Sequence, residues 1–256
     1  MKYFLSIVII FIGSLKNIKA QELYVFSEPA STMPARSVIV KESYTQMANM
    51  GAQNFNTQVE FSLAKKWMVH VGTNFKAADF YSQYRFYSQD EMYKHTRLAW
   101  YFRGVLSPDI ANQKAFLYDG QQSLVGSGII LTRLQHKWAS SLTMGITHRR
   151  DGFAGVGQEA FQYSFSNGWL LYPKKYESYD QTNFNFYIEI LGQKLLHNNG
   201  YYLDMAPAIQ FIFNSQSKLN LGYRFALDDP MKRPVNKGVY ISYDFLFFNA
   251  LPKLKK

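Results

Sequence analysis

Apolar and polar residues alternate strictly in short stretches between about residues 38 and 248. The stretch 218–227 shows the pattern most clearly. One side carries Leu219, Leu221, Tyr223, Phe225 and Leu227, and the other carries Asn220, Gly222, Arg224 and Ala226. A period of two residues predicts a β-strand with one apolar face and one face in a wetter environment.

Repeated around a closed sheet, this alternation is typical of a transmembrane β-barrel, because closure satisfies every backbone polar group inside a bilayer. We therefore predict an all-β fold: a transmembrane antiparallel up-and-down β-barrel of about twelve strands, over residues 37–248. The strands are expected at about 36–44, 54–64, 67–76, 80–88, 95–106, 122–134, 138–148, 158–171, 181–193, 200–213, 218–227 and 238–248.

The predicted connections alternate in length, as they would if both chain ends lay in the periplasm. Short turns fall at 65–66, 136–137 and 214–217, and longer connections at 45–53, 107–121, 149–157 and 228–237. The connections at 77–79, 89–94 and 172–180 do not fit this alternation.

A soluble lipocalin-like barrel is the main structural alternative, with its apolar faces turned inward instead of outward. Aromatic residues make up 17% of the chain, which suits lipid-facing surfaces and interfacial girdles. Trp67, Trp138 and Trp169 fall near the periplasmic ends of their strands and predict one such girdle, with Trp100 in mid-strand.

The residues before and after the predicted barrel have separate roles in the prediction. Residues 1–20 are expected to be a cleaved signal peptide, with an early lysine and an apolar run too short to span a bilayer. An uncleaved helical anchor is the alternative. Residues 21–36 contain prolines and no sustained alternation, which predicts a periplasmic lead-in or a plug, and residues 249–256 form a basic tail.

The formal net charge is +10, but the predicted export argues against nucleic acid as a partner. Lipid phosphate groups are the more plausible counter-charge, and a solvated basic surface is the alternative. The chain has no cysteine.

Because a signal peptide and a transmembrane barrel are predicted, the expected location is the outer membrane of a Gram-negative bacterium. The aromatic final strand, Val239 to Phe247, suits recognition by barrel-insertion machinery.

Three segments, 22–35 (ELYVFSEPASTMPA), 170–181 (LLYPKKYESYDQ) and 201–215 (YYLDMAPAIQFIFNS), resemble an uncharacterised family of outer-membrane β-barrel proteins of Bacteroidota-type bacteria. The resemblance covers most of the chain after the signal peptide. It implies an outer-membrane barrel, loosely described as transporter-like, and brings no catalytic residues. The tail after Phe248 departs from the family pattern.

With the apolar faces assigned to lipid, the opposite faces of the strands supply the lumen. The residues expected there include Glu60, His70, Arg97 and Asp244. The candidates for solute selectivity, expected near mid-strand, are Arg85, Arg103, Glu189, Asp204 and Arg224. Such charges either set a field that favours one sign of solute or pair with each other and stiffen the barrel.

Arg149 and Arg150 are expected at the outer rim, where guanidinium groups match lipopolysaccharide phosphates. Neighbouring His148 is the one histidine placed to serve a lipid-modifying enzyme, although no motif joins it to a serine and an acid. A solvated loop is the simpler interpretation.

No cofactor or metal is expected. Met33, Met47, Met50 and Met68 are better read as apolar filler than as soft metal ligands, because cysteine and paired histidines are lacking. Pro207 interrupts a predicted strand and marks a bulge or a locally unpaired site.

The preferred function is a narrow channel or transporter for small solutes. The alternatives are a closed structural or interaction barrel that binds a partner or lipopolysaccharide and, third, a lipid-modifying outer-membrane enzyme.

Overall fold

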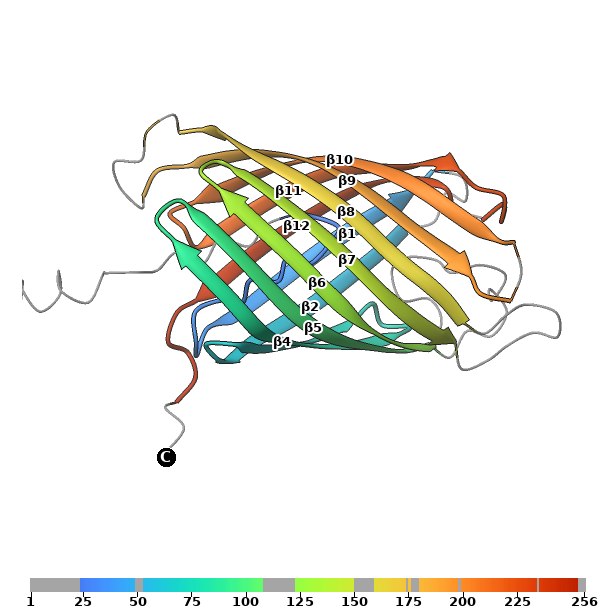
Figure 1. The fold of residues 1–256 in the computed structure, drawn as a ribbon, viewed down its shortest axis with the longest axis horizontal. Helices are drawn as coiled ribbons and strands as arrows, with labels where there is room; N and C mark the ends of the chain where they lie inside the picture. Colours follow the sequence, from blue (N-terminus) through green and yellow to red (C-terminus); the bar gives the residue numbers. More distant parts are fainter. Residues whose placement is uncertain are drawn as a thin grey trace, which may run out of the picture.

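The computed structural model describes residues 24–48, 53–107, 123–149, 159–173, 175, 180–197, 199–233 and 235–252. They form twelve β-strands in one closed antiparallel barrel, which confirms the predicted fold class (Figure 1). The strands are β1 (Val38–Met47), β2 (Gln53–Ala64), β3 (Trp67–Thr73), β4 (Ala78–Glu91), β5 (Lys94–Leu106), β6 (Leu124–Gln135), β7 (Trp138–Arg149), β8 (Glu159–Tyr172), β9 (Asn183–Leu195), β10 (Tyr201–Phe213), β11 (Ser217–Asp228) and β12 (Lys237–Phe247). Each strand pairs with its sequence neighbours, and β1 closes the barrel against β12. Within the described ranges no helix is long and apolar enough to cross a membrane.

The two faces of the sheet differ sharply in polarity. Large apolar side chains such as Trp100, Ile129 and Phe165 are exposed on the outer surface. Acids and amides such as Gln83 and Glu189 are buried on the inner surface. A soluble lipocalin-like barrel would show the reverse, so this distribution favours lipid around the barrel.

The two ends of the barrel are named here by their connections. The terminal end, where β1 begins and β12 ends, carries the turns 65–66, 92–93, 136–137, 173–182 and 214–216. The loop end carries the connections 48–52, 74–77, 107–123, 150–158, 196–200 and 229–236. In Figure 1 the end of β12 and the β6–β7 turn both lie on the left side of the barrel, which is the terminal end.

The β4–β5 connection is tighter than the sequence pattern predicted. β4 runs to Glu91, so only Met92 and Tyr93 form the turn. The register with β5 shifts between Arg85 and Tyr87, which makes Phe86 an extra residue in β4. Because such a bulge reverses the alternation of faces, the period-two signal is lost beyond it and the strand is underestimated.

β3 is the shortest strand, with seven residues. Its first residue, Trp67, lies opposite Tyr84, so the part of β4 from Arg85 to Glu91 has no β3 residue beside it. The β4–β5 hairpin therefore extends past the β2–β3 turn at the terminal end.

The tryptophans lie where the sequence places them. Trp138 and Trp169 face each other across β7 and β8 at the terminal end, and both are exposed. Trp67 is exposed at the same end and donates to Ser82 Oγ at 3.0 Å. These indoles form an aromatic girdle of the kind that fits a membrane–water interface.

Pro207 has no partner in β11 and forms no bulge. Its pairing with Ile188 of β9 is continuous, whereas the pairing with β11 passes from Met205 to Ala208 without a change of register. The register shift between β10 and β11 lies earlier in the strand, between Leu203 and Asp204.

Candidate functional site

Residues 24–37, called the N-terminal segment below, run along the inner face of the barrel. The backbone N–H groups of Val25 and Phe26 both donate to Oε1 of Glu189, at 2.9 Å each. Glu189 is the central residue of β9 and is 0% exposed. Its Oε2 accepts a hydrogen bond from Ser166 Oγ at 3.1 Å. One carboxylate therefore fixes the end of the segment that lies halfway along the barrel.

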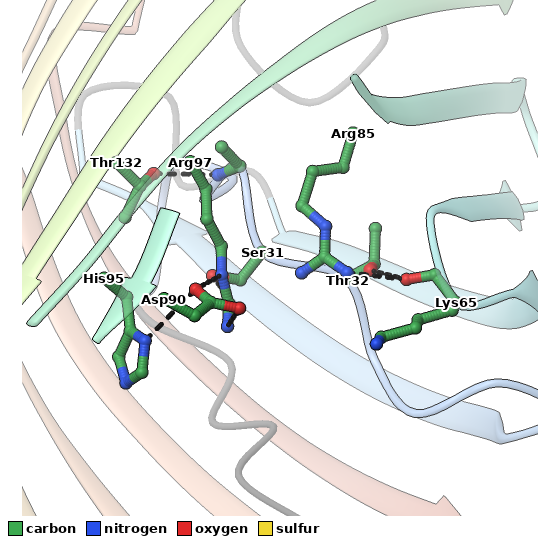
Figure 2. A network of polar contacts seen from close by, with 9 residues as sticks. Ser31, Thr32, Lys65, Arg85, Asp90, His95, Arg97 and Thr132 are labelled. Atoms are coloured by element: carbon green, nitrogen blue, oxygen red, sulfur yellow. Dashed lines mark hydrogen bonds and ion pairs between the residues drawn. The ribbon is translucent and has the colours of Figure 1, made fainter. Parts of the chain in front are cut away.

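At the terminal end the segment is tied to the strand ends around it (Figure 2). Thr32 Oγ1 and a guanidinium N–H of Arg85 both donate to the carbonyl of Lys65, at 2.8 Å each. Arg97 donates to Ser31 Oγ at 3.0 Å. These bonds join the segment to the β2–β3 turn and to β5.

Figure 2 also shows what orients Arg97. Asp90, on the partner strand of the same hairpin, accepts from Arg97 Nε at 3.1 Å and lies 3.1 Å from His95 Nδ1. Further into the barrel, Ala30 N–H donates to Thr132 Oγ1 at 2.8 Å. The segment is thus hydrogen-bonded along most of its length, which a loosely trailing lead-in would not be.

Aromatic rings fill the space beside the segment. The ring of Phe26 lies 5.2 Å from that of Tyr240, and the ring of Tyr24 lies 5.6 Å from that of Tyr187. Burial, together with the nearby Glu189 carboxylate, holds the pKa of the Tyr24 phenol well above its ordinary value. Tyr24 therefore stays neutral and packs as an apolar ring.

Phe26 rests against a strand position that only glycine fits. A Cβ on Gly222 would lie 2.6 Å from the Phe26 ring. Because the clashing atoms belong to the segment, the segment would move before the barrel wall does. We expect Gly222→Leu to lower the free energy of unfolding of the barrel by no more than about 1–3 kcal/mol, the range for overpacking, because the Phe26 ring can move away from the added side chain.

In the same variant a Ser27→Cys reporter should react faster with a membrane-impermeant maleimide, since its hydroxyl sits beside Phe26. The chain has no native cysteine to interfere. An equal rate of labelling in the parent and in Gly222→Leu would contradict this role of Gly222.

On the loop-end side of the segment lies a cavity of about 260 Å³, called the shaft below. Residues 25–28 of the segment line its floor, and it reaches Asn54 and Asn74 near the loop end. β1 to β5 supply all the charged side chains of its wall except Arg224: Lys41, His70, Asp79 and Arg103. β6 to β9 supply only neutral residues: Leu124, Ile130, Thr143, Thr147, Gln162, Tyr163, Ser164, Leu191, Gly192 and Gln193. The shaft thus has a charged wall facing a neutral wall.

The predicted luminal residues all face inward, but the structure separates them. Arg103 lines the shaft, and Glu189 lies below its floor and holds the segment. Arg85 is at the level of the β2–β3 turn, since its backbone N–H donates to the carbonyl of Lys66 at 2.8 Å. Arg85 is luminal and lies in the middle of β4, as expected, but the bulge and the extended hairpin place the middle of this strand toward the terminal end.

Asp204 and Arg224 form an ion pair at 2.7 Å, with both side chains buried. A third member, Arg233, comes from the β11–β12 loop and was not anticipated. Its side chain is 0% exposed, pairs with Asp204 and with Asp229, and lies 3.6 Å from the centre of the Tyr202 ring. This loop therefore folds back into the barrel mouth, and the two arginines share one carboxylate.

Arg149, one of the two residues predicted to contact lipopolysaccharide at the outer rim, does not present its side chain on the outer surface. Arg149 lies on the same face of β7 as Thr147, points inward and is 1% exposed. Arg150 lies outside the described residues. His148 faces outward at the loop end, and its Nδ1 lies 3.7 Å from Glu159, which is also 3.5 Å from Nε2 of His197.

The methionines considered as metal ligands belong to the packed interior where they are described. Met33, Met47 and Met68 are buried, and Met50 lies outside the described residues. In the parts of the chain that the structure covers, no group of three or more His, Cys, Asp or Glu residues is placed to hold a metal ion.

No protein-family model and no curated protein sequence matches the chain. Solved structures do resemble it in fold. The KdgM porin has a TM-score of 0.52 at 5% identity, covering 82% of this chain and 99% of that chain. The NanC porin has a TM-score of 0.51 at 8% identity, covering 82% of this chain and 100% of that chain. An outer membrane channel from Pseudomonas putida F1 has a TM-score of 0.53 at 9% identity, covering 88% of this chain and 100% of that chain. The likeness is one of fold.

Proposed function

We propose that the protein is an outer-membrane channel for small polar solutes whose lumen is closed by its own N-terminal segment. The observation that carries this proposal is the shaft, which ends on residues 25–28. The apolar outer surface suits lipid, and the resemblance in fold to porins agrees with that setting. The terminal end would face the periplasm and the loop end the cell exterior.

A polar lumen alone does not distinguish a channel from a closed barrel. Beneath the shaft floor the segment is hydrogen-bonded to wall residues on several sides, including Gln83, which donates to the carbonyl of Pro29 at 3.0 Å. This packing also favours the second candidate, a closed barrel whose outer loops bind a partner.

The test is conductance in a planar bilayer, measured for the chain after removal of residues 1–20 and for a variant that also lacks residues 21–31. If the segment closes a channel, the shortened variant should conduct steadily while the longer chain conducts rarely or not at all. Silence from both proteins, with the barrel shown to be folded by its resistance to SDS, would overturn the channel proposal and favour the closed barrel.

A further inference from the structure

Two opposite charges in the shaft have no close partner in the described part of the chain. Glu28 of the segment and Arg103 of β5 both line the shaft and are half-buried. Neither forms an ion pair within 4 Å or a hydrogen bond with a described residue. Two other luminal arginines contrast with this: Arg224 is paired with Asp204, and Arg97 with Asp90. A charge kept half-buried without a partner is costly, which makes it a candidate for contact with a ligand.

The neighbours of these two groups are already engaged. Asp79, an acid of the wall that interacts with Arg103, lies 3.0 Å from Nε2 of His70 and also bonds Gln58. Lys41, near Glu28, faces Asp244 across β1 and β12 and interacts with Glu60 as well. Lys41 is therefore shared among several carboxylates and does not neutralise Glu28 alone.

Tyr81 interacts with both charges. It pairs in register with Arg103, and both Glu28 and Arg103 act on it electrostatically. Its ring is stacked between those of His70 and Tyr101, so the three rings form a rigid panel along the charged wall. The opposite wall is neutral, and the cavity volume of about 260 Å³ is large enough for a small molecule.

We propose that the floor of the shaft binds a small zwitterion of the amino-acid or short-peptide class, with its carboxylate on Arg103 and its ammonium on Glu28. Guanidinium groups bind carboxylates through paired hydrogen bonds, and an ammonium group donates to a carboxylate. The inference rests on the proposed function only in taking the shaft as the place where solute enters. Because Glu28 belongs to the segment, the ligand would touch the element that closes the lumen.

The test is equilibrium binding of three probes to the detergent-purified chain after removal of residues 1–20, measured by calorimetry. The probes are alanyl-alanine, its N-acetyl derivative, which lacks the ammonium, and its C-terminal amide, which lacks the carboxylate. We expect alanyl-alanine to bind at least about tenfold more tightly than either derivative, since each loses one charge-assisted contact.

Two variants assign the ends of the ligand. Arg103→Gln should weaken the binding of alanyl-alanine to the level of the amide and leave the binding of the amide unchanged. Arg103→Lys should restore part of the preference for alanyl-alanine over the amide. Glu28→Gln should weaken the binding of alanyl-alanine to the level of the N-acetyl derivative and leave the binding of that derivative unchanged. Arg133→Gln removes an exposed arginine on the outer face and is the matched control.

Equal affinity for the three probes, no binding of alanyl-alanine, or an unchanged order of affinity in Arg103→Gln would overturn the inference. Since binding is measured without a membrane, its result is separate from conductance. Binding without conductance in the shortened variant would overturn the channel and leave the zwitterion site standing. Conductance without discrimination among the probes would overturn the site alone.

Discussion

Replacing Asp204 with alanine is expected to destabilise the folded barrel by about 3–5 kcal/mol, the range for removing one partner of a buried ion pair. Asp204 is the carboxylate shared by Arg224 and Arg233, and all three side chains are at most 6% exposed. Without it two guanidinium groups remain buried side by side, and the anchor of the β11–β12 loop is lost. Urea unfolding of the barrel in detergent micelles, followed by tryptophan fluorescence, measures the loss.

Asp228→Ala is the matched control, because it removes the same kind of side chain from an exposed site near the mouth. Asp228 accepts a hydrogen bond from Tyr201 at 2.6 Å, and its loss should cost no more than about 1 kcal/mol. Changing Arg224 and Arg233 to methionine in the Asp204→Leu background should recover much of the stability, since apolar groups can replace a buried ion cluster. Equal losses for Asp204→Ala and Asp228→Ala would show that burial does not govern this cluster.

Replacing Glu189 with alanine is expected to release the N-terminal segment and to open the lumen. The carboxylate accepts from Val25, Phe26 and Ser166, and hydrogen bonds to a charged group contribute about 1.5–3 kcal/mol each. Loss of the two bonds to the segment would shift the closed-to-open equilibrium by about 100-fold or more. Single-channel recording should show a matching rise in open probability. Asp244→Asn, which also alters a buried luminal acid, should leave it unchanged.

A reversible cross-link separates release of the segment from damage to the wall. Ser27 and Ser166 have their hydroxyl oxygens 2.7 Å apart, so cysteines at these positions should form a disulfide that holds the segment on β8. In the Glu189→Ala background the oxidised pair should close the channel, and dithiothreitol should reopen it. A cysteine pair at Ser43 and Ser242, which face each other within the wall, is the control. Openings that persist in the oxidised Ser27–Ser166 variant would show that the segment is not the barrier.

The sequence predicted the strands well because the bilayer and the lumen impose a period of two on every strand. The same period also predicts the side of Arg149. Because Thr147 faces inward, the residue two positions later, Arg149, is expected to face inward as well. Ending the predicted strand at residue 148 moved Arg149 to the rim. At Phe86 the rule failed for a physical reason, since one extra residue reverses the faces without any change in composition.

The contacts inside the lumen could not be predicted from the sequence. Alternation shows which face is wet but not which groups meet across the barrel. The contact between Val25 and Glu189 joins residues 164 positions apart, and that between Asp204 and Arg233 joins a strand to an irregular loop. Neither contact leaves a periodic signal. The pair Asp204 and Arg224 faced inward as expected, but nothing in the sequence separated it, as a structural cluster, from Arg103 in the shaft.

The short β3 strand has a consequence for the surrounding lipid. Seven residues at about 3.4 Å per residue, tilted by about 35–45°, extend about 18 Å along the bilayer normal. The apolar band of an outer-membrane barrel is about 25 Å tall. We therefore expect lipid beside β3 to thin, at a cost of a fraction of a kcal/mol per Å of mismatch. The bilayer would be deformed on one side of the barrel only, and that deformation would favour contacts with other proteins whose walls are equally short.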